Sequence, residues 1–215
     1  MRLSEIFYSL QGEGQEAGLP TVFVRFAGCS LRCAWCDTEY AFYGGLEAQV
    51  EEVVQRMEKY PTRRACVTGG EPLDQMEACL ALMDALLKRG WTIQLETSGG
   101  VAIDRAVKLA PRRNLMVSLD VKCPSSGMTE RNTWSNLALL EPHDQVKFII
   151  GDEKDYEYAR QVLKDHPEMG TKRVFLNPVW GISLKWLSER VLADGLDVHV
   201  GVQMHKLIWG TEKGR

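Results

Sequence analysis

The chain has 215 residues, 45% of them hydrophobic and 26% charged, and its net charge at pH 7 is −3. This composition is typical of an ordinary globular protein, and the slightly acidic charge argues against direct nucleic-acid binding, which leaves a basic footprint. No apolar stretch approaches the roughly 20 residues of a membrane span, and the N-terminus lacks the pattern of a secretory signal. We therefore expect a cytoplasmic protein with no membrane contact, a single domain over residues 1–215, and reduced cysteines.

Short apolar runs alternate with amphipathic stretches along the chain. The apolar runs predict strands at residues 21–26, 64–68, 92–96, 115–120, 145–150, 173–176 and 198–204. Their lack of polar alternation is typical of parallel strands covered on both faces. The amphipathic stretches predict helices within residues 46–57, 76–87, 155–164 and 183–193, with Gly90 and Gly195 as C-caps. The repeated strand–helix order predicts an α/β fold with mostly parallel strands and crossover helices.

Six motifs come at or directly after the ends of predicted strands. They occupy residues 29–36, 68–72, 96–99, 120–122, 177–178 and 203–206. In folds of this type, ligands gather at the carboxyl ends of the strands. We therefore expect these motifs to converge on one rim of the sheet.

The most informative motif is a run of three cysteines, Cys29, Cys33 and Cys36, in the pattern C-x3-C-x2-C. Three thiolates are one short of a structural zinc site or of the usual electron-transfer cluster. A cubane cluster on three cysteines leaves one iron open for chemistry. Two alternatives stay open: buried thiols on a helix face, or zinc with Asp37 or a distant histidine as fourth ligand. Gly28 and the turn-like residues around the run favour a loop that holds a cluster.

The other three cysteines are scattered along the chain. Cys66 lies inside a predicted strand and Cys79 on an apolar helical stretch, so both are expected in the core. Cys123 follows the motif at 120–122, and the sequence leaves it open between core and rim.

The cysteine spacing, with Trp35 directly before the last cysteine, resembles the signature of the radical S-adenosylmethionine (SAM) superfamily. The Gly-Gly-Glu-Pro sequence at 69–72 resembles the second motif of that superfamily. The resemblance implies a partial TIM-like βα barrel and a [4Fe–4S] cluster on Cys29, Cys33 and Cys36, with SAM on the open iron. It also implies an external electron donor, whose electron cleaves SAM to a 5′-deoxyadenosyl radical.

A narrower resemblance covers nearly the whole chain. The segments at residues 7–14, 22–26, 36–38 and 203–206 (Gln-Met-His-Lys) resemble the 7-carboxy-7-deazaguanine synthase family. This implies conversion of 6-carboxy-5,6,7,8-tetrahydropterin to 7-carboxy-7-deazaguanine with loss of ammonia, on the route to queuosine and other 7-deazapurines. It further implies a reduced barrel, a homodimer and a requirement for Mg²⁺.

The resemblance also implies roles for individual residues. The substrate-binding residues it implies are Leu10, Gln11, Gly12, Glu13, Arg25, Thr68 and His205. The SAM-binding residues it implies are Trp35, Gly70, Glu71, Glu96, Ser98, Asp120 and Lys122. Thr38 is the implied Mg²⁺ ligand. The residue chemistry agrees for Arg25, because a guanidinium interrupting an apolar strand is suited to clamp a carboxylate.

Two departures from the family pattern leave questions open. Asp-Val-Lys stands at 120–122, where many synthases carry Ser-Pro-Lys, and Asp-x-Lys is closer to the activating enzymes of glycyl-radical proteins. Such an activating enzyme is the main alternative, and a structural zinc or electron-transfer module is a second one. Arg25 and residues 10–13 argue against the former, and the Gly-Gly-Glu-Pro motif argues against the latter. Residues 208–215 could close the site or fray.

Overall fold

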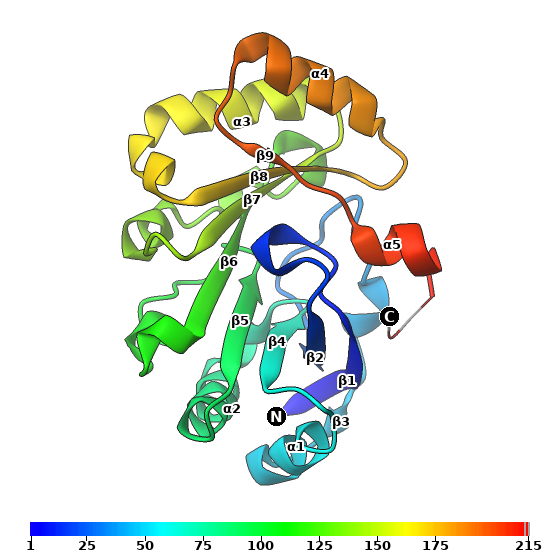
Figure 1. Ribbon diagram of the computed structural model, residues 1–215, viewed down its shortest axis with the longest axis vertical. Coiled ribbons are helices and arrows are strands. Elements are labelled where there is room, and N and C mark those ends of the chain that lie inside the picture. The colour runs from blue at the N-terminus through cyan, green and yellow to red at the C-terminus, as the bar shows by residue number, and fades with distance from the viewer. Residues whose placement is uncertain (213, 215) are drawn as a thin grey trace.

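The structure is a computed structural model that describes residues 1–212 and 214. One nine-stranded sheet, in the order β3-β1-β2-β4-β5-β6-β7-β8-β9, forms its centre (Figure 1). The strands are β1 (Arg2–Leu10), β2 (Pro20–Phe26), β3 (Leu46–Glu47), β4 (Arg64–Gly69), β5 (Thr92–Thr97), β6 (Leu115–Val121), β7 (Gln145–Ile150), β8 (Arg173–Pro178) and β9 (His199–Val200). From β2 to β9 every neighbouring pair is parallel, whereas β1 is antiparallel to β2 and β3.

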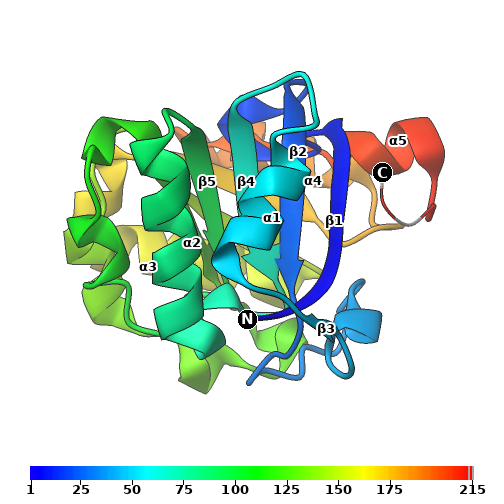
Figure 2. The same ribbon diagram turned by 90° about the horizontal axis from the view of Figure 1, so that it is seen from below.

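Helices cover the outside of this curved sheet. They are α1 (Val50–Met57), α2 (Met76–Lys88), α3 (Glu153–Asp165), α4 (Leu184–Asp194) and α5 (Met204–Trp209). Figure 1 shows α3 and α4 over the β7–β9 part of the sheet, and Figure 2 shows α1 and α2 side by side against the β2–β5 part. The short helix α5 lies apart from these four, near the end of the chain (Figure 1). The described part of the chain has no helix long and apolar enough to cross a membrane.

The ends of the helices follow ordinary capping chemistry. The Asp152 side chain accepts a hydrogen bond from Asp155 N at the start of α3, and the Ser183 hydroxyl accepts one from Trp186 N at the start of α4. Gly195 ends α4 in the left-handed conformation, with φ of 60°, which glycine adopts at little cost. These caps set where α3 and α4 begin and where α4 ends.

The core lies between the parallel strands and the outer helices. Its largest fully buried side chains include Trp91, Tyr156, Phe26 and Phe148. The buried positions of Cys66 and Cys79 confirm the prediction for both, and Cys123 is fully buried as well.

The expected fold class, a mostly parallel α/β sheet of partial-barrel type, is confirmed. The prediction of a strand at 198–204 is wrong over most of its length, since β9 has two residues and α5 begins at Met204. The chain leaves the sheet at Gly201, where a Cβ atom would lie 2.0 Å from Oδ1 of Asn177. The helix expected from residue 46 begins instead at Val50, because Leu46 pairs with Leu3 in β3.

Candidate active site

A cavity of about 660 Å³ opens at the carboxyl ends of the strands. The residues that the sequence predicted for the site converge there, as expected for motifs that follow parallel strands. The predicted residues that line the cavity are Leu10, Gln11, Gly12, Glu13, Arg25, Cys29, Cys33, Trp35, Cys36, Thr38, Thr68, Gly70, Glu96, Ser98, Asp120, Lys122 and His205. The described lining does not include the remaining predicted residue, Glu71.

The three cysteines lie on a loop without regular helix, which excludes the helix-face interpretation. Backbone bonds tie this loop to its neighbours: Glu71 N donates to Gly28 O at 3.0 Å, and Ala34 N donates to Ser126 O at 3.0 Å. The Ser30 hydroxyl adds a bond of 3.0 Å to Asp74 Oδ1. The loop is therefore held on both sides before any ligand binds.

The thiols of Cys29, Cys33 and Cys36 are unpaired and partly exposed toward the cavity. Burial raises the pKa of each thiol above its usual value, and the nearby Lys122 ammonium opposes this rise for Cys33. In residues 1–212 and 214, no three His, Cys, Asp or Glu side chains form a group that could hold a single metal ion. A cubane cluster needs no such convergence, because each of its three cysteines binds a different iron. Three half-buried thiols facing one cavity fit that arrangement.

Gly70 lies directly against the cysteine loop. A Cβ atom at this position would come within 2.4 Å of Gly28 O and 2.5 Å of Cys29 Cβ. Only glycine allows this approach without displacing the loop. The close packing of the two segments brings the backbone at Gly70 to the cavity beside the cysteines.

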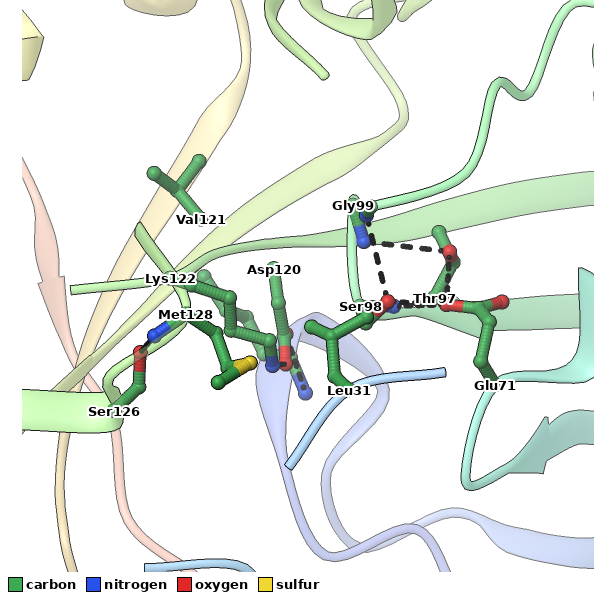
Figure 3. Close-up of polar contacts among 12 residues, drawn as sticks. Leu31, Glu71, Thr97, Ser98, Gly99, Asp120, Val121, Lys122, Ser126 and Met128 are labelled. Carbon is green, nitrogen blue, oxygen red and sulfur yellow. Dashed lines mark hydrogen bonds and ion pairs between the residues drawn. The ribbon is translucent and has the colours of Figure 1, made fainter. Parts of the chain in front are cut away.

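The carboxylate of Glu71 is fully buried and does not belong to the described lining of the cavity. It accepts hydrogen bonds from Leu73 N at 2.9 Å, Thr97 Oγ1 at 2.9 Å, Ser98 N at 2.7 Å and Ser98 Oγ at 2.5 Å (Figure 3). Burial raises the pKa of Glu71, and the bonds from Ser98 are the largest opposing effect. The side chain of Glu71 is therefore a clamp between the loop after β4 and the end of β5.

A chain of buried charges crosses the cavity floor. Lys122 Nζ lies 2.8 Å from Asp120 Oδ2 (Figure 3), and Lys147 Nζ lies 3.5 Å from Asp120 Oδ1 and 3.1 Å from Glu13 Oε2. Burial alone would lower the pKa of Lys147, but Asp120, Glu96 and Glu13 together raise it well above its usual value. The ammonium thus stays charged at neutral pH.

Sequence reasoning missed Lys147. The available signal was a lysine in the middle of the apolar run 145–150, where a charge is expensive unless it is paired. Its β7 position is in register with Asp120 on β6. Asp120, together with Glu13 and Glu96, explains why the strand tolerates the charge, and the sequence does not reveal these pairings.

The opposite wall carries Gln11 and Arg25. The Gln11 amide is engaged within the protein: its Nε2 donates to Gln94 Oε1 at 2.8 Å, and its Oε1 accepts from Gly12 N at 2.8 Å. Arg25 Nε donates to Glu5 Oε1 at 2.8 Å and Nη1 donates to Gly69 O at 3.3 Å. These contacts orient the guanidinium in the cavity wall, so Arg25 is more than a surface-paired arginine.

Helix α5 closes one side of the cavity. Gln203 Nε2 donates to Glu13 Oε1 at 2.9 Å, and Lys206 Nζ donates to Asp37 Oδ2 at 2.5 Å. Burial alone would raise the pKa of Asp37, but its hydrogen bond and charge interaction with Lys206 lower it to about 2. The His205 ring lies against Gly12, where no Cβ would fit, and burial lowers its pKa. The Gln-Met-His-Lys motif therefore joins the two ends of the chain at the cavity.

Two further predicted residues have defined partners. The indole Nε1 of Trp35 donates to Ser125 Oγ at 2.9 Å, and Lys122 Nζ lies 5.8 Å from the centre of the Trp35 ring. The Thr38 hydroxyl, directly after the cysteine loop, donates to Asp37 Oδ1 at 2.8 Å. Trp35 is therefore tied to the segment after β6, whereas Thr38 is bonded to its neighbour in the chain.

Comparison with known proteins agrees with this geometry. The family model of the Radical SAM superfamily matches residues 23–182. A 7-carboxy-7-deazaguanine synthase from Koribacter versatilis is 37% identical, over 99% of this chain and 98% of the relative. One from Thermoplasma acidophilum is also 37% identical, over 100% of both chains. The crystal structure of QueE from Escherichia coli has a TM-score of 0.75 and 26% identity, over 95% of this chain and 94% of that chain.

These similarities extend over the whole length of the chain, including the segments before and after the cysteine loop. The antiparallel strand β1 and the helix α5 both contribute to the cavity, and both lie within the aligned length. The match is therefore not confined to the cysteine motif shared by the wider superfamily. The chain belongs to the radical SAM superfamily and, within it, to the family of 7-carboxy-7-deazaguanine synthases.

Proposed function

We propose that this protein is an enzyme that converts 6-carboxy-5,6,7,8-tetrahydropterin to 7-carboxy-7-deazaguanine with loss of ammonia, in queuosine and 7-deazapurine biosynthesis. The observation that carries the proposal is Arg25, which lies in the wall of the same cavity as the three-cysteine loop. Its guanidinium is a planar fork suited to the substrate carboxylate. The alternative, an activating enzyme for a glycyl-radical protein, is not favoured, because the full-length relatives are synthases.

The cofactors would occupy the side of the cavity nearest the cysteines. Cys29, Cys33 and Cys36 would hold the [4Fe–4S] cluster, which together with SAM supplies a radical that takes a hydrogen atom from the substrate. The residues that would bind SAM are Trp35, Gly70, Glu71 (through its backbone), Glu96, Ser98, Asp120 and Lys122. Lys122 suits the SAM carboxylate because its ammonium is buried in the cavity floor. Ser125 would keep the Trp35 ring in one orientation.

The substrate would lie on the other side, between β1, β2 and α5. Arg25 would bind its carboxylate, and Glu13, Thr68 and His205 would contact the ring. Leu10, Gln11 and Gly12 would shape the pocket through the backbone, since the Gln11 amide already bonds within the protein. This arrangement would hold the reacting C–H near the cofactor and exclude water, which matters because a radical takes the nearest accessible hydrogen.

The proposed reaction also uses Mg²⁺ and an external electron donor. Thr38 would be the protein's ligand to Mg²⁺, with substrate oxygens and water completing the octahedral shell that this ion prefers. We also propose a cytoplasmic homodimer that receives electrons from an external donor, with residues 1–215 acting as one radical SAM domain.

The decisive experiment is anaerobic reconstitution with iron and sulfide, followed by incubation with 6-carboxy-5,6,7,8-tetrahydropterin, SAM, Mg²⁺ and a reductant. The proposal expects ammonia and 7-carboxy-7-deazaguanine in equal amounts. If 5′-deoxyadenosine forms but neither product does, the substrate assignment is wrong.

Arg25→Lys is expected to raise KM for the pterin about tenfold to hundredfold, because a lysine point charge cannot make the paired hydrogen bonds of a guanidinium. Steady-state kinetics with the reconstituted protein measures this effect. Arg113→Lys, at an exposed position, serves as the matched control and should leave KM unchanged. Equal KM values for the wild type and Arg25→Lys would remove Arg25 from the carboxylate site.

Thr38→Ala is expected to raise the Mg²⁺ concentration for half-maximal activity about tenfold, since one of the few protein ligands is lost. A Mg²⁺ titration of product formation measures the change, with Thr171→Ala as an exposed control. Calorimetry should show Mg²⁺ binding only when the substrate is present. Tight binding without substrate that survives Thr38→Ala would contradict the assignment.

A further inference from the structure

Lys147 pairs with carboxylates on both the cofactor side and the substrate side of the cavity proposed above. Its ammonium pairs with Asp120, on the cofactor side, and with Glu13, on the substrate side. Asp120 in turn pairs with Lys122, and Glu13 accepts a hydrogen bond from Gln203. One buried cation therefore connects β6, β7, the segment after β1 and the residue before α5.

Burial of the Lys147 ammonium destabilises the folded protein unless nearby groups compensate its charge. The side chain is 6% exposed and stands in a strand whose neighbours, Val146 and Phe148, belong to the hydrophobic core. Burying an ammonium is expensive unless carboxylates surround it. Glu13, Glu96 and Asp120 supply that compensation, and Lys147 in turn offsets part of the negative charge that these three carboxylates bring to the cavity.

Loss of the Lys147 charge would make the cavity more negative toward a bound ligand. Without Lys147, this part of the cavity would carry the carboxylates of Glu13, Glu96 and Asp120, and the ammonium of Lys122 is already paired with Asp120. Such a surface repels an anion, because charge interactions are strong in a partly desolvated cavity. Arg25 offers only partial compensation, since it is already paired with Glu5.

We propose that Lys147 is a specificity-determining residue that, by pairing with Glu13 and Asp120 at once, makes the cavity accept a carboxylated pterin beside SAM. The inference rests on the proposed function for the identity of the substrate. It adds a separate claim, that the preference for an anionic pterin depends on a residue on β7 as well as on Arg25. Lys147 acts here as a positioning residue, through the two carboxylates that it holds.

The test compares two fluorescent pterins, anionic 6-carboxypterin and neutral 6-methylpterin, binding to the reconstituted protein with SAM. Lys147→Met is expected to raise the Kd of 6-carboxypterin at least about tenfold and that of 6-methylpterin less than about threefold. Lys147→Arg keeps the charge and should restore the preference to within about threefold of the wild type. Lys108→Met, at an exposed lysine paired with Asp104, is the matched control.

A purely structural role of Lys147 predicts that Lys147→Met weakens both pterins equally, and that result would overturn the inference, as would unchanged binding of both. If Lys147→Met does not fold, the double variant with Glu13→Gln removes one carboxylate together with the ammonium. The binding of the two pterins is then compared in this double variant and in Lys147→Arg.

Turnover gives a second readout. If SAM cleavage is no longer coupled to conversion of the pterin, the ratio of 5′-deoxyadenosine to product should rise. If the wild type binds neither pterin and forms no 7-carboxy-7-deazaguanine from the tetrahydropterin, the proposed function fails and the inference falls with it. If the wild type prefers 6-carboxypterin and Lys147→Met does too, only the inference fails.

Discussion

Gly70→Ala is expected to lower cluster occupancy about tenfold or more and to abolish SAM cleavage. The added Cβ would lie 2.4 Å from Gly28 O and 2.5 Å from Cys29 Cβ, well inside contact distance. Neither side can yield easily, because Gly70 N donates to Phe26 O at 3.3 Å and Glu71 N donates to Gly28 O at 3.0 Å. Overpacking of this kind typically costs about 1–3 kcal/mol. The relief must come from moving the loop that carries the cysteines.

Iron content per chain and the visible absorbance of the reconstituted protein measure the occupancy. Gly170→Ala is the matched control, because a Cβ at Gly170 meets no atom within 4 Å. That variant should load iron like the wild type. Thermal unfolding of the apo forms completes the comparison. If Gly70→Ala binds a full complement of iron and cleaves SAM at the normal rate, the cysteine loop does not depend on this contact.

Glu71→Ala is expected to reduce the free energy of unfolding by about 4 kcal/mol, since it leaves several buried donors unsatisfied. The donors are Leu73 N, Thr97 Oγ1, Ser98 N and Ser98 Oγ, and all four bond to one carboxylate. Glu71→Gln should cost only about 1–2 kcal/mol, because its carbonyl oxygen can replace Oε2 and only the bond to Leu73 N is lost. Urea denaturation measures both values, and Glu189→Ala, at an exposed helix position, is the control.

The pH dependence of the free energy of unfolding also tests whether the Glu71 carboxyl is a buried clamp. Burial raises the folded-state pKa of Glu71, so the native protein holds this proton more tightly than the unfolded chain does. The stabilisation from this group is therefore fully present below the unfolded pKa, about 4.3, and is lost as pH rises through the folded pKa. Glu71→Gln should remove this part of the pH dependence. An unchanged profile, or a loss below about 1 kcal/mol for Glu71→Ala, would contradict the clamp.

Most of the parallel sheet was predictable because its strands carry local signals. Residues 64–68, 92–96 and 145–150 are short apolar runs, and the structure has β4, β5 and β7 at these places. The sequence did not predict the antiparallel strand β1 because its polar and apolar residues mix, as expected for a strand covered by less of the core. Helix α5 was also missed, since Met204 and its neighbours continue an apolar run that reads equally well as a strand.

The candidate site was predictable where a motif needs particular residues close together in the chain. The three cysteines and the glycines at 69–70 are of this kind, and the structure packs Gly70 against Gly28 and Cys29. Glu71 shows the opposite case, because its motif does not reveal the partners of its side chain. Those partners include Thr97 and Ser98, which lie 26 and 27 residues away in the chain.

By itself, the sequence determined the fold class, the cysteine loop and the family, because these depend on local patterns and on motifs a few residues long. The tertiary structure alone decided which charges meet. Lys147 is an isolated lysine in the sequence, 134 residues from Glu13, and it becomes part of the cavity only when β7 lies in register with β6. The physical reason is that the cost of a buried charge depends on its neighbours in space, and these neighbours are fixed only once the sheet has formed.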